Sequence, residues 1–491
     1  MAKILLIKTT KTYASDKALS PPLGLLYLSA YLRQQRSADQ IRIIDLRTVR
    51  HGQQVLAQTC RDFAPDIIAF SSMTIESTCL HEMARWCRQH APGAIIIVGG
   101  PHAASFQQQI LADPNIDYLL AGEGEIPFLQ FVNAMEANQR TPAISGLSYK
   151  DANGAVVSSP ANRDLVDLAT LPMPAWDMID FDDYTDARMS PISQGRYAAL
   201  FTSRGCPYRC TYCHNIFPKR YRAMTPPQVV NEIEYLVNRY QIREFEIYDD
   251  SFNLNYQRAM AICDEIIRRG LKIRLLFPNG VRGDLLDEAL IKRLRQAGTI
   301  FLAMAVESAS PRIQKEIKKN NDLEKIRHNI TVAAREGIFT WGAFMMGFVR
   351  ETRRELWQTA RYAITSDLHG AHFFIVIPQA NTELGRQAGL DVSQYADIKA
   401  TDYWTTKNTL ACVSHWELWL WQMLAFFLFY ANPVRIYRAI RVFPYPARVF
   451  CHRVFRRGGV FVWLTFFRNL MYRLHRQKKR PALAGRQAPA L

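Results

Sequence analysis

Short apolar runs rich in β-branched residues alternate with stretches of helical apolar spacing over the first 132 residues. The apolar runs are Ile4–Ile7, Ile41–Ile44, Ile67–Phe70, Ala94–Val98 and Tyr118–Leu120. Segments between them, such as 23–33 and 80–90, have the length and periodicity of helices. Short continuous apolar runs separated by helices are typical of buried parallel strands. The alternation predicts an α/β fold whose first domain, residues 1–142, is a Rossmann-like doubly wound sheet.

The same alternation resumes with a longer repeat at about residue 195. Six apolar runs are separated by helix-sized segments, at 198–202, 244–248, 274–277, 300–306, 340–345 and 372–377. Six such units predict a partial (β/α)6 barrel of the TIM type over residues 195–390, with functional residues at the carboxyl ends of its strands. Residues 143–194 are expected to be a linker with hairpin-like pieces at 147–150 and 156–158. Residues 391–491 are expected to form a helical, basic tail.

Three cysteines follow the first predicted barrel strand within eight residues. Cys206, Cys210 and Cys213 have the spacing C-x3-C-x2-C. Three thiolates can bind three corners of an iron–sulfur cube and leave the fourth iron open. A zinc site would need a fourth Cys or His at matching spacing, which His214 is poorly placed to supply, and a thioredoxin-like motif needs only C-x-x-C. The spacing therefore favours an open [4Fe–4S] cluster.

The cysteine motif, with the aromatic residue Tyr212 before its last cysteine, resembles the signature of the radical S-adenosylmethionine (SAM) superfamily. The resemblance implies that SAM binds the open iron and that one electron cleaves it to a 5′-deoxyadenosyl radical. It also implies a reductant such as flavodoxin or ferredoxin. By the same resemblance, Tyr212, Asp250 and Glu307 lie near the cofactor, and a carboxylate suits the SAM ammonium group. The alternative is a helix N-cap at Asp250 or Ser251.

Glycines and other small residues recur after the predicted strands of the first domain. In order and placement, this set resembles the cobalamin-binding domain that precedes the radical SAM domain in one large subclass. Strand-end glycines permit close backbone approach to a ligand. The resemblance implies a cobalamin crevice made by Leu23, Gly24, Ser71, Gly99, Gly100, His102, Gly122 and Glu123.

Two details of this crevice stay open in the sequence. The string Asp-x-His-x-x-Gly, which supplies a lower histidine ligand in other cobalamin proteins, is absent. The lower cobalt face could therefore carry water, a different side chain or no ligand. His102 is either a corrin contact or an ordinary loop or core histidine. Glu123 and Glu125 also suit the start of a helix, where carboxylates interact favourably with the macrodipole.

Positive charge is concentrated at the end of the chain. After Glu417 there are fourteen Lys and Arg residues and no Asp or Glu, within a formal net charge of +17. The apolar stretch 416–430 is shorter than the roughly 20 residues that span a bilayer. One expectation is helices that pack over the barrel mouth, and the other is an amphipathic element on anionic lipid. Nucleic acid is not expected, because no folded recognition motif accompanies the charge.

The remaining sequence features concern compartment and function class. No signal-peptide or Arg-rich leader pattern opens the chain, and the other six cysteines have no disulfide-framework spacing. A cytoplasmic enzyme is expected, with its tail at most peripheral on the inner face of the membrane. The main hypothesis is a cobalamin-dependent radical SAM C-methyltransferase that acts on a small or lipid-like metabolite. The alternatives are a non-methylating oxidative cyclase or rearrangement enzyme and, more remotely, an iron–sulfur electron-transfer or binding module.

Overall fold

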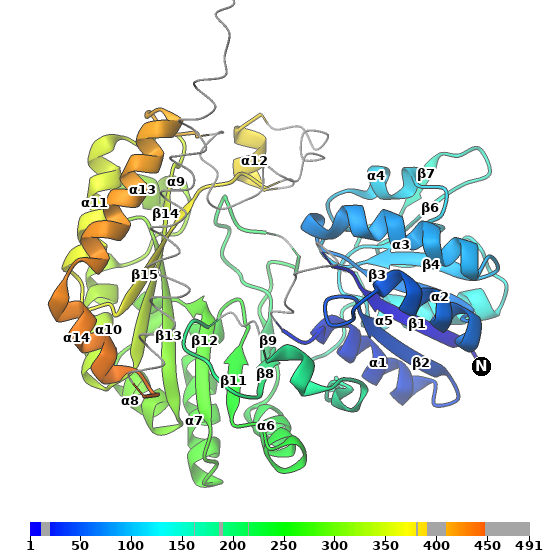
Figure 1. Cartoon of the computed structure of the whole chain (residues 1–491), viewed down its shortest axis with the longest axis horizontal. Helices are drawn as coiled ribbons and strands as arrows, with labels where there is room; N and C mark the ends of the chain where they lie inside the picture. Colours follow the sequence, from blue (N-terminus) through cyan, green and yellow to red (C-terminus); the bar gives the residue numbers. More distant parts are fainter. Residues whose placement is uncertain are drawn as a thin grey trace, which may run out of the picture. The chain divides into compact units, whose positions relative to one another are not determined.

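The computed structural model describes residues 1–10, 20–161, 163–185, 190–214, 216–379, 382–389 and 409–446. Residues 1–435 form one compact unit. This unit contains two large sheets, which Figure 1 colours blue to cyan and green to yellow. Most of the predicted basic tail, residues 447–491, lies outside the described residues.

The first sheet has seven strands in the order β2-β1-β3-β4-β5-β6-β7. Their bounds are β1 (Lys3–Lys8), β2 (Gln40–Asp45), β3 (Ile67–Ser71), β4 (Ile95–Gly99), β5 (Tyr118–Leu120), β6 (Leu147–Lys150) and β7 (Val156–Ser158). The first five strands are parallel, which confirms the predicted doubly wound sheet. The strand order reverses between β1 and β3, the position at which such sheets bind ligands beyond the carboxyl ends of their strands.

Two strands from the expected linker belong to this sheet. β6 pairs antiparallel with β5, and β7 pairs antiparallel with β6. The hairpin expected at 147–150 and 156–158 is therefore present, but it extends the sheet past residue 142. The sequence indicates a hairpin through its local pattern, whereas its pairing with β5 depends on a tertiary contact that no local pattern contains.

Five helices bury both faces of the parallel strands (Figure 1): α1 (Leu23–Gln35), α2 (Gly52–Phe63), α3 (Ser77–His90), α4 (Gln107–Ala112) and α5 (Glu125–Glu136). Alternate residues of β1 enter two separate cores. Leu5 and Ile7 pack with α2, α3 and α4, whereas Ile4 and Leu6 pack with α1 and α5. Burial on both faces explains why these strands are continuous apolar runs.

The second sheet is parallel throughout, in the order β15-β14-β13-β12-β11-β8. Its strands are β8 (Tyr197–Leu200), β11 (Glu244–Ile247), β12 (Arg274–Val281), β13 (Thr299–Glu307), β14 (Phe339–Met346) and β15 (Gly370–Ile375). Each strand lies beside its sequence neighbours, and β8 and β15 form the two edges. This is the predicted partial (β/α)6 barrel, open between its first and last strands.

Helices cover the outside of this sheet (Figure 1). The main ones are α6 (Pro226–Tyr240), α7 (Tyr256–Arg268), α8 (Glu288–Gln296), α10 (Leu323–Arg335) and α11 (Arg353–Thr365), with the short α9 (Pro311–Glu316) and α12 (Glu383–Gln387) in loops. The two-residue strands β9 (Ser203–Arg204) and β10 (Arg222–Ala223) pair with each other at the start and end of the cysteine loop.

The apolar stretch in the tail is helical, as α13 (His415–Tyr430), and is followed by α14 (Pro433–Val442). The Tyr430 hydroxyl accepts from the Ala371 amide at 3.1 Å and donates to the Ala371 carbonyl at 2.9 Å, and the Gln422 amide donates to the Phe373 carbonyl at 2.6 Å. These bonds satisfy backbone groups on the free edge of β15. The helix thus packs along the barrel's open edge, against β15 and α11, and the expectation that it lies over the barrel mouth is wrong. Among the described residues, no helix is long and apolar enough to cross a membrane.

Candidate active site

The cysteine loop begins where β8 and β11 end, and a buried carboxylate anchors it. Asp249 accepts hydrogen bonds from the Thr202 amide at 2.6 Å, the Thr202 hydroxyl at 2.5 Å and the Ser203 hydroxyl at 2.6 Å. Gly205 then turns the chain with φ of 80°, and a Cβ there would lie 2.3 Å from the Arg220 carbonyl oxygen. The loop therefore requires glycine at this turn.

Loops from the far side of the barrel hold the other end of the cysteine loop. The Thr211 amide donates to the Ile317 carbonyl at 3.1 Å, and the Thr211 carbonyl accepts from the Leu384 amide at 2.9 Å. The Tyr212 ring packs against the Phe348 ring, with the ring centres 6.0 Å apart. The backbone around the cysteines is thus held by hydrogen bonds on both sides.

The three predicted cluster ligands are partly exposed free thiols. Among the described residues, no three His, Cys, Asp or Glu side chains gather around one point, as a single metal ion would require. A mononuclear zinc site does not fit this arrangement, and a [4Fe–4S] cluster takes each of its cysteines on a different iron. Cys206, Cys210 and Cys213 are the residues that could hold it.

Cations that the sequence analysis missed surround these thiols. Burial raises the pKa of Cys213 to about 11, and Lys219 and Lys319 act in the opposite direction. Lys319 is half-buried and Arg282 is buried, and the guanidinium carbon of Arg282 lies 4.0 Å from the centre of the Tyr208 ring. Both cations interact with Cys210. Nearby positive charge favours thiolates, the form in which cysteine binds iron.

Asp250 faces the cysteine loop from the end of β11. Its Oδ1 lies 3.9 Å from His214 Nε2, and its charge raises the pKa values of Cys206 and Cys213 in addition to the larger effect of burial. Asn279 fixes this turn by donating to the Asp249 carbonyl at 3.0 Å. Of the two residues considered for a helix N-cap, Ser251 occupies that position before the next helical segment and Asp250 does not. Asp250 is therefore a carboxylate that could hold a SAM ammonium group.

Glu307 and Tyr212, both predicted near SAM, contact each other. The Tyr212 hydroxyl donates to the Glu307 carboxylate, which also accepts from Lys319 Nζ at 3.3 Å. Glu307 has a left-handed backbone with φ of 67°, at an irregularity in the pairing of β13. Such strain in a non-glycine residue is uncommon and clusters at functional sites. The pair ties the cysteine loop to the end of β13.

A cavity of about 160 Å³ opens at the carboxyl ends of the first sheet, and both domains line it. Six predicted crevice residues are among its walls: Gly24, Ser71, Gly99, Gly100, Gly122 and Glu123. The barrel contributes Phe201, Arg204 and Phe217. The crevice and the cysteine segment thus meet at one cavity, which no pattern in the sequence indicated.

Two predicted crevice residues do not line the cavity. Leu23 is buried in the core beside Leu26 and Tyr27. His102 is buried against Phe106, with ring centres 4.9 Å apart, and its Nδ1 has no hydrogen-bond partner among the described residues. Burial lowers the pKa of His102 to about 4, so the imidazole is neutral. The structure places His102 as a core histidine.

Two glycines in the cavity walls differ in the space around them. No atom lies within 4 Å of where a Cβ on Gly24 would stand, so the approach to its backbone is open. Gly100 has φ of 87°, and a Cβ there would lie 2.9 Å from the Ser72 amide nitrogen. Gly100 therefore requires glycine, whereas Gly24 leaves open space through which a ligand could approach the backbone. Gly24, Ser71, Gly99, Gly100 and Gly122 could hold the corrin.

Buried ion pairs join the two domains beside this cavity. Arg204 donates to Glu123 at 3.0 Å and to Glu125 at 2.7 Å, and Arg222 forms a second ion pair with Glu123. The Arg204 guanidinium also lies 4.9 Å over the Tyr27 ring. Glu123 and Glu125, expected to interact with a helix macrodipole, thus have buried cationic partners from the barrel. Although Arg204 is next to Gly205 in the signature, its partners could not be read from the sequence.

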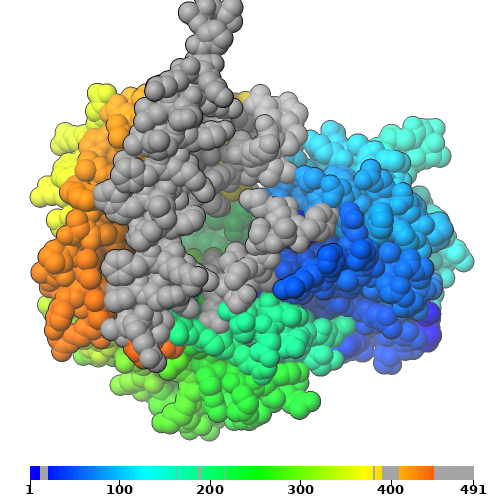
Figure 2. All heavy atoms as spheres, viewed as in Figure 1, coloured from blue at the N-terminus to red at the C-terminus, as the bar shows by residue number. Residues whose placement is uncertain are grey.

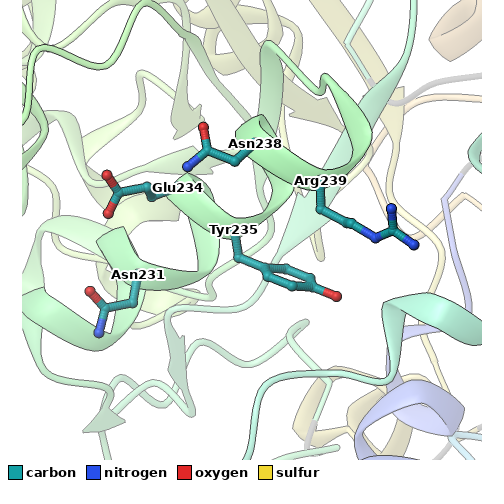
Figure 3. Close-up of a pocket in the computed structure, with 5 residues that line it drawn as sticks. All are labelled: Asn231, Glu234, Tyr235, Asn238 and Arg239. Carbon is teal, nitrogen blue, oxygen red and sulfur yellow. The ribbon is translucent and has the colours of Figure 1, made fainter.

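A second, more open hollow of about 510 Å³ lies along α6 (Figure 3). Its five lining residues all come from that helix: Asn231, Glu234, Tyr235, Asn238 and Arg239. None of them belongs to the cysteine loop or to the glycine-lined cavity. A hollow on the outer face of one helix has no convergent polar groups from other elements, so it is a poor candidate for the active site.

Comparison with known proteins places these sites in two families. Residues 12–132 match the B12 binding domain, and residues 200–363 match the Radical SAM superfamily. The uncharacterized methyltransferase PH0819 of Pyrococcus horikoshii is 30% identical over 392 residues, which cover 79% of this chain and 83% of the relative.

Two further proteins are similar to this chain. The anaerobic magnesium-protoporphyrin IX monomethyl ester cyclase of Cereibacter sphaeroides is 29% identical over 350 residues, or 70% of this chain and 56% of the relative. Among solved structures, the radical S-adenosylmethionine methyltransferase TsrM from Kitasatospora setae, with cobalamin and a [4Fe–4S] cluster bound, has the same fold, with a TM-score of 0.68. It is 18% identical and is matched over 79% of this chain and 78% of its own.

Proposed function

The chain belongs to the cobalamin-binding radical SAM enzymes, and we propose that it is a C-methyltransferase acting on an unactivated carbon. Its cofactors are a [4Fe–4S] cluster, SAM and cobalamin. The predicted family, fold class and cofactors are therefore confirmed.

One observation supports this proposal most strongly. The glycine-lined strand ends of the first sheet and the segment that leads into the cysteine motif share the walls of one cavity. Methyl transfer to a carbon radical needs the radical source and the methyl carrier within reach of one acceptor. An enzyme that used cobalamin only to stabilise its fold would not need this shared opening.

Each predicted group has a role in this proposal. Cys206, Cys210 and Cys213 hold the cluster, and Asp250 binds the SAM ammonium group. Glu307 and Tyr212 position the cysteine loop, since they bind each other. Gly24, Ser71, Gly99, Gly100 and Gly122 let the corrin approach the backbone. When bound, the cluster supplies the electron that cleaves SAM, and cobalamin carries the methyl group.

The partners complete the proposal. We propose that the methyl acceptor is a small or lipid-like metabolite. The electron comes from a reductant such as flavodoxin or ferredoxin. The enzyme works in the cytoplasm, with a peripheral contact between its C-terminal region and the inner face of the membrane.

A non-methylating cyclase is the second candidate, because a cyclase is 29% identical over 70% of this chain. The experiment compares anaerobically reconstituted enzyme with and without cobalamin, given SAM, a reductant and a cell extract from a strain lacking the gene. Methyl transfer predicts both 5′-deoxyadenosine and S-adenosylhomocysteine, the second only with cobalamin. Formation of 5′-deoxyadenosine alone would favour the cyclase, and formation of neither would contradict both candidates.

A further inference from the structure

The face of α13 turned away from β15 is apolar and exposed. Trp416, Leu420, Leu424 and Phe427 lie on one side of the helix, three or four residues apart, and are 40, 56, 41 and 55% exposed. We call these four residues the apolar ridge. Leu418, Ala425 and Phe429, on the opposite side of α13, are buried. A helix that is apolar on its outer side as well as its buried side needs a partner for the outer side.

The neighbouring helix α11 contributes arginines beside the ridge. Its exposed residues include Arg353, Arg354, Trp357 and Arg361, and no exposed acid. The centre of the Trp357 ring lies 6.4 Å from the centre of the Trp421 ring. Trp357 of α11 therefore packs beside α13 and extends its aromatic surface. Figure 2 shows α13 and α14, in orange, on the molecular surface beside the yellow-green region that includes α11.

Negative charge on this surface is neutralised. Glu417 is the one acid of α13, and Arg353 donates to its Oε2 at 2.7 Å. The acid of α11, Glu355, is buried and accepts from Arg312 at 2.7 Å. Arg354 and Arg361 have no acidic partner among the described residues. The surface therefore combines an apolar ridge with uncompensated positive charge.

We propose that the apolar ridge and the arginines of α11 form a docking surface for an anionic lipid bilayer. This deepens, and rests on, the peripheral membrane contact of the proposed function. Tryptophan, leucine and phenylalanine insert into the interface, while arginine side chains extend to lipid phosphates. Since no described helix can span the bilayer, the contact is peripheral.

A second copy of this chain is the competing occupant, and the charges argue against it. A two-fold contact across the ridge would bring Arg354 and Arg361 of both copies together without exposed acids to pair with them. All the charged residues after Glu417 are Lys or Arg, apart from histidine. One of these, Arg435, is buried and donates to the carbonyls of Leu368 and Phe429, so it supports the fold instead. The charge that remains favours an anionic partner.

The test is vesicle flotation with the full-length, cofactor-loaded enzyme. Vesicles contain phosphatidylcholine alone or phosphatidylcholine with phosphatidylglycerol, at low and high salt. The ridge variant carries Leu420→Glu and Phe427→Glu. Its matched control carries Val156→Glu and Val157→Glu, since these two residues of β7 are 39% exposed on the other sheet. A third variant carries Arg354→Gln and Arg361→Gln.

Binding of the wild type and the control to anionic vesicles is expected, with a loss at high salt. The ridge variant should bind at least about tenfold more weakly. The arginine variant should lose about fivefold per arginine, the effect of one basic residue at an anionic surface. Equal binding by the ridge variant and the control, or equal binding to both kinds of vesicle, would overturn the proposal. A wild-type dimer in light scattering that the ridge variant abolishes would assign the surface to a second copy.

A separate readout keeps this test independent of the enzymatic proposal. SAM cleavage without acceptor, measured as 5′-deoxyadenosine, should be unchanged in the ridge variant, because none of its changes touches the cavity or the cysteine loop. Loss of vesicle binding with retained cleavage supports the docking surface. Absence of cleavage in the wild type would contradict the proposed function and leave the lipid result to stand alone.

Discussion

Arg204, two residues before the first proposed cluster ligand, donates to the carboxylate of Glu125 at 2.7 Å, and each side chain is 5% exposed. Glu125 begins α5, directly after the loop that carries Gly122 at the cavity. This bond therefore joins the proposed cluster loop to the proposed cobalamin crevice through two buried charges. We expect this ion pair to hold the two proposed sites in place relative to each other.

Replacement of Arg204 by alanine should be strongly destabilising. It would leave the buried carboxylate of Glu125 without a partner, and breaking a buried ion pair in this way costs about 3–5 kcal/mol. Arg33→Ala is the matched control, because Arg33 pairs with Asp177 at 2.8 Å on the exposed surface. Such a pair is worth less than about 1 kcal/mol. Denaturant unfolding measures both variants, and equal losses would contradict the role given to Arg204.

The three cysteines of the motif should be required for the cluster. With Cys206, Cys210 and Cys213 all changed to alanine, reconstituted protein should hold no [4Fe–4S] cluster and should form no 5′-deoxyadenosine. Cys412→Ala is the control, since Cys412 is an exposed free cysteine outside the motif. Iron analysis and SAM cleavage check the prediction. Continued cleavage by the triple variant would refute the cluster assignment.

The two neighbouring aspartates should separate SAM binding from loop stability. Asp250→Asn removes the charge that faces the cysteine loop, so SAM affinity should fall by about thirtyfold, equivalent to about 2 kcal/mol for a charge-assisted bond. Iron content should be retained. Asp249→Asn instead disturbs the anchor of Thr202 and Ser203 and should lower iron content and stability. Equilibrium SAM binding by both reconstituted variants provides the measurement, and unchanged affinity in Asp250→Asn would contradict this assignment.

Filling the crevice at Gly24 should block cobalamin without harming the fold. Gly24 lies in the first turn of α1 with open space beside it, so Gly24→Leu costs no packing and improves helix propensity. Cobalamin binding should weaken by more than about tenfold because the leucine enters the cavity. Gly93→Leu is the control, since Gly93 is equally unobstructed but does not line the cavity. Absorbance titration with hydroxocobalamin distinguishes them, and equal binding by both variants would contradict the crevice.

Bound Co(II) cobalamin should show no nitrogen splitting from a protein histidine in its electron paramagnetic resonance spectrum. The string Asp-x-His-x-x-Gly is absent, and His102 is buried against Phe106 outside the cavity walls. A nitrogen pattern that disappears in His102→Gln would contradict this placement.

The alternation of strands and helices was sufficient to predict both sheets, because central parallel strands such as β1, β3 and β4 are buried on two faces and read as continuous apolar runs. Residues 4–7 illustrate this, since neighbouring side chains enter opposite cores. The cysteine motif was also recognisable, because its spacing is local. The pairing of β6 with β5 was not, since the hairpin's local pattern does not identify its neighbour.

The parts of the site missed in the sequence depend on contacts between distant residues. Arg204, Lys319 and Arg282 are ordinary basic residues in the sequence, and only the folded chain brings them to buried carboxylates and thiols. Glu307 was identified by its place at a strand end, but its bond to Tyr212 spans 95 positions of the chain and could not be read locally. The same limit applies to α13, whose apolar composition did not reveal that Gln422 and Tyr430 bind the edge of β15.

Transfer of a labelled methyl group tests the central proposal most directly. Purified enzyme with cluster and cobalamin is incubated anaerobically with SAM bearing a trideuterated methyl group, a reductant and metabolite extract from a strain lacking the gene. The account predicts a product heavier than its precursor by one methylene group, with deuterium from SAM in the new methyl, and no such product from the triple cysteine variant. A product formed by oxidation or rearrangement, with 5′-deoxyadenosine released but no deuterium incorporated, would contradict it.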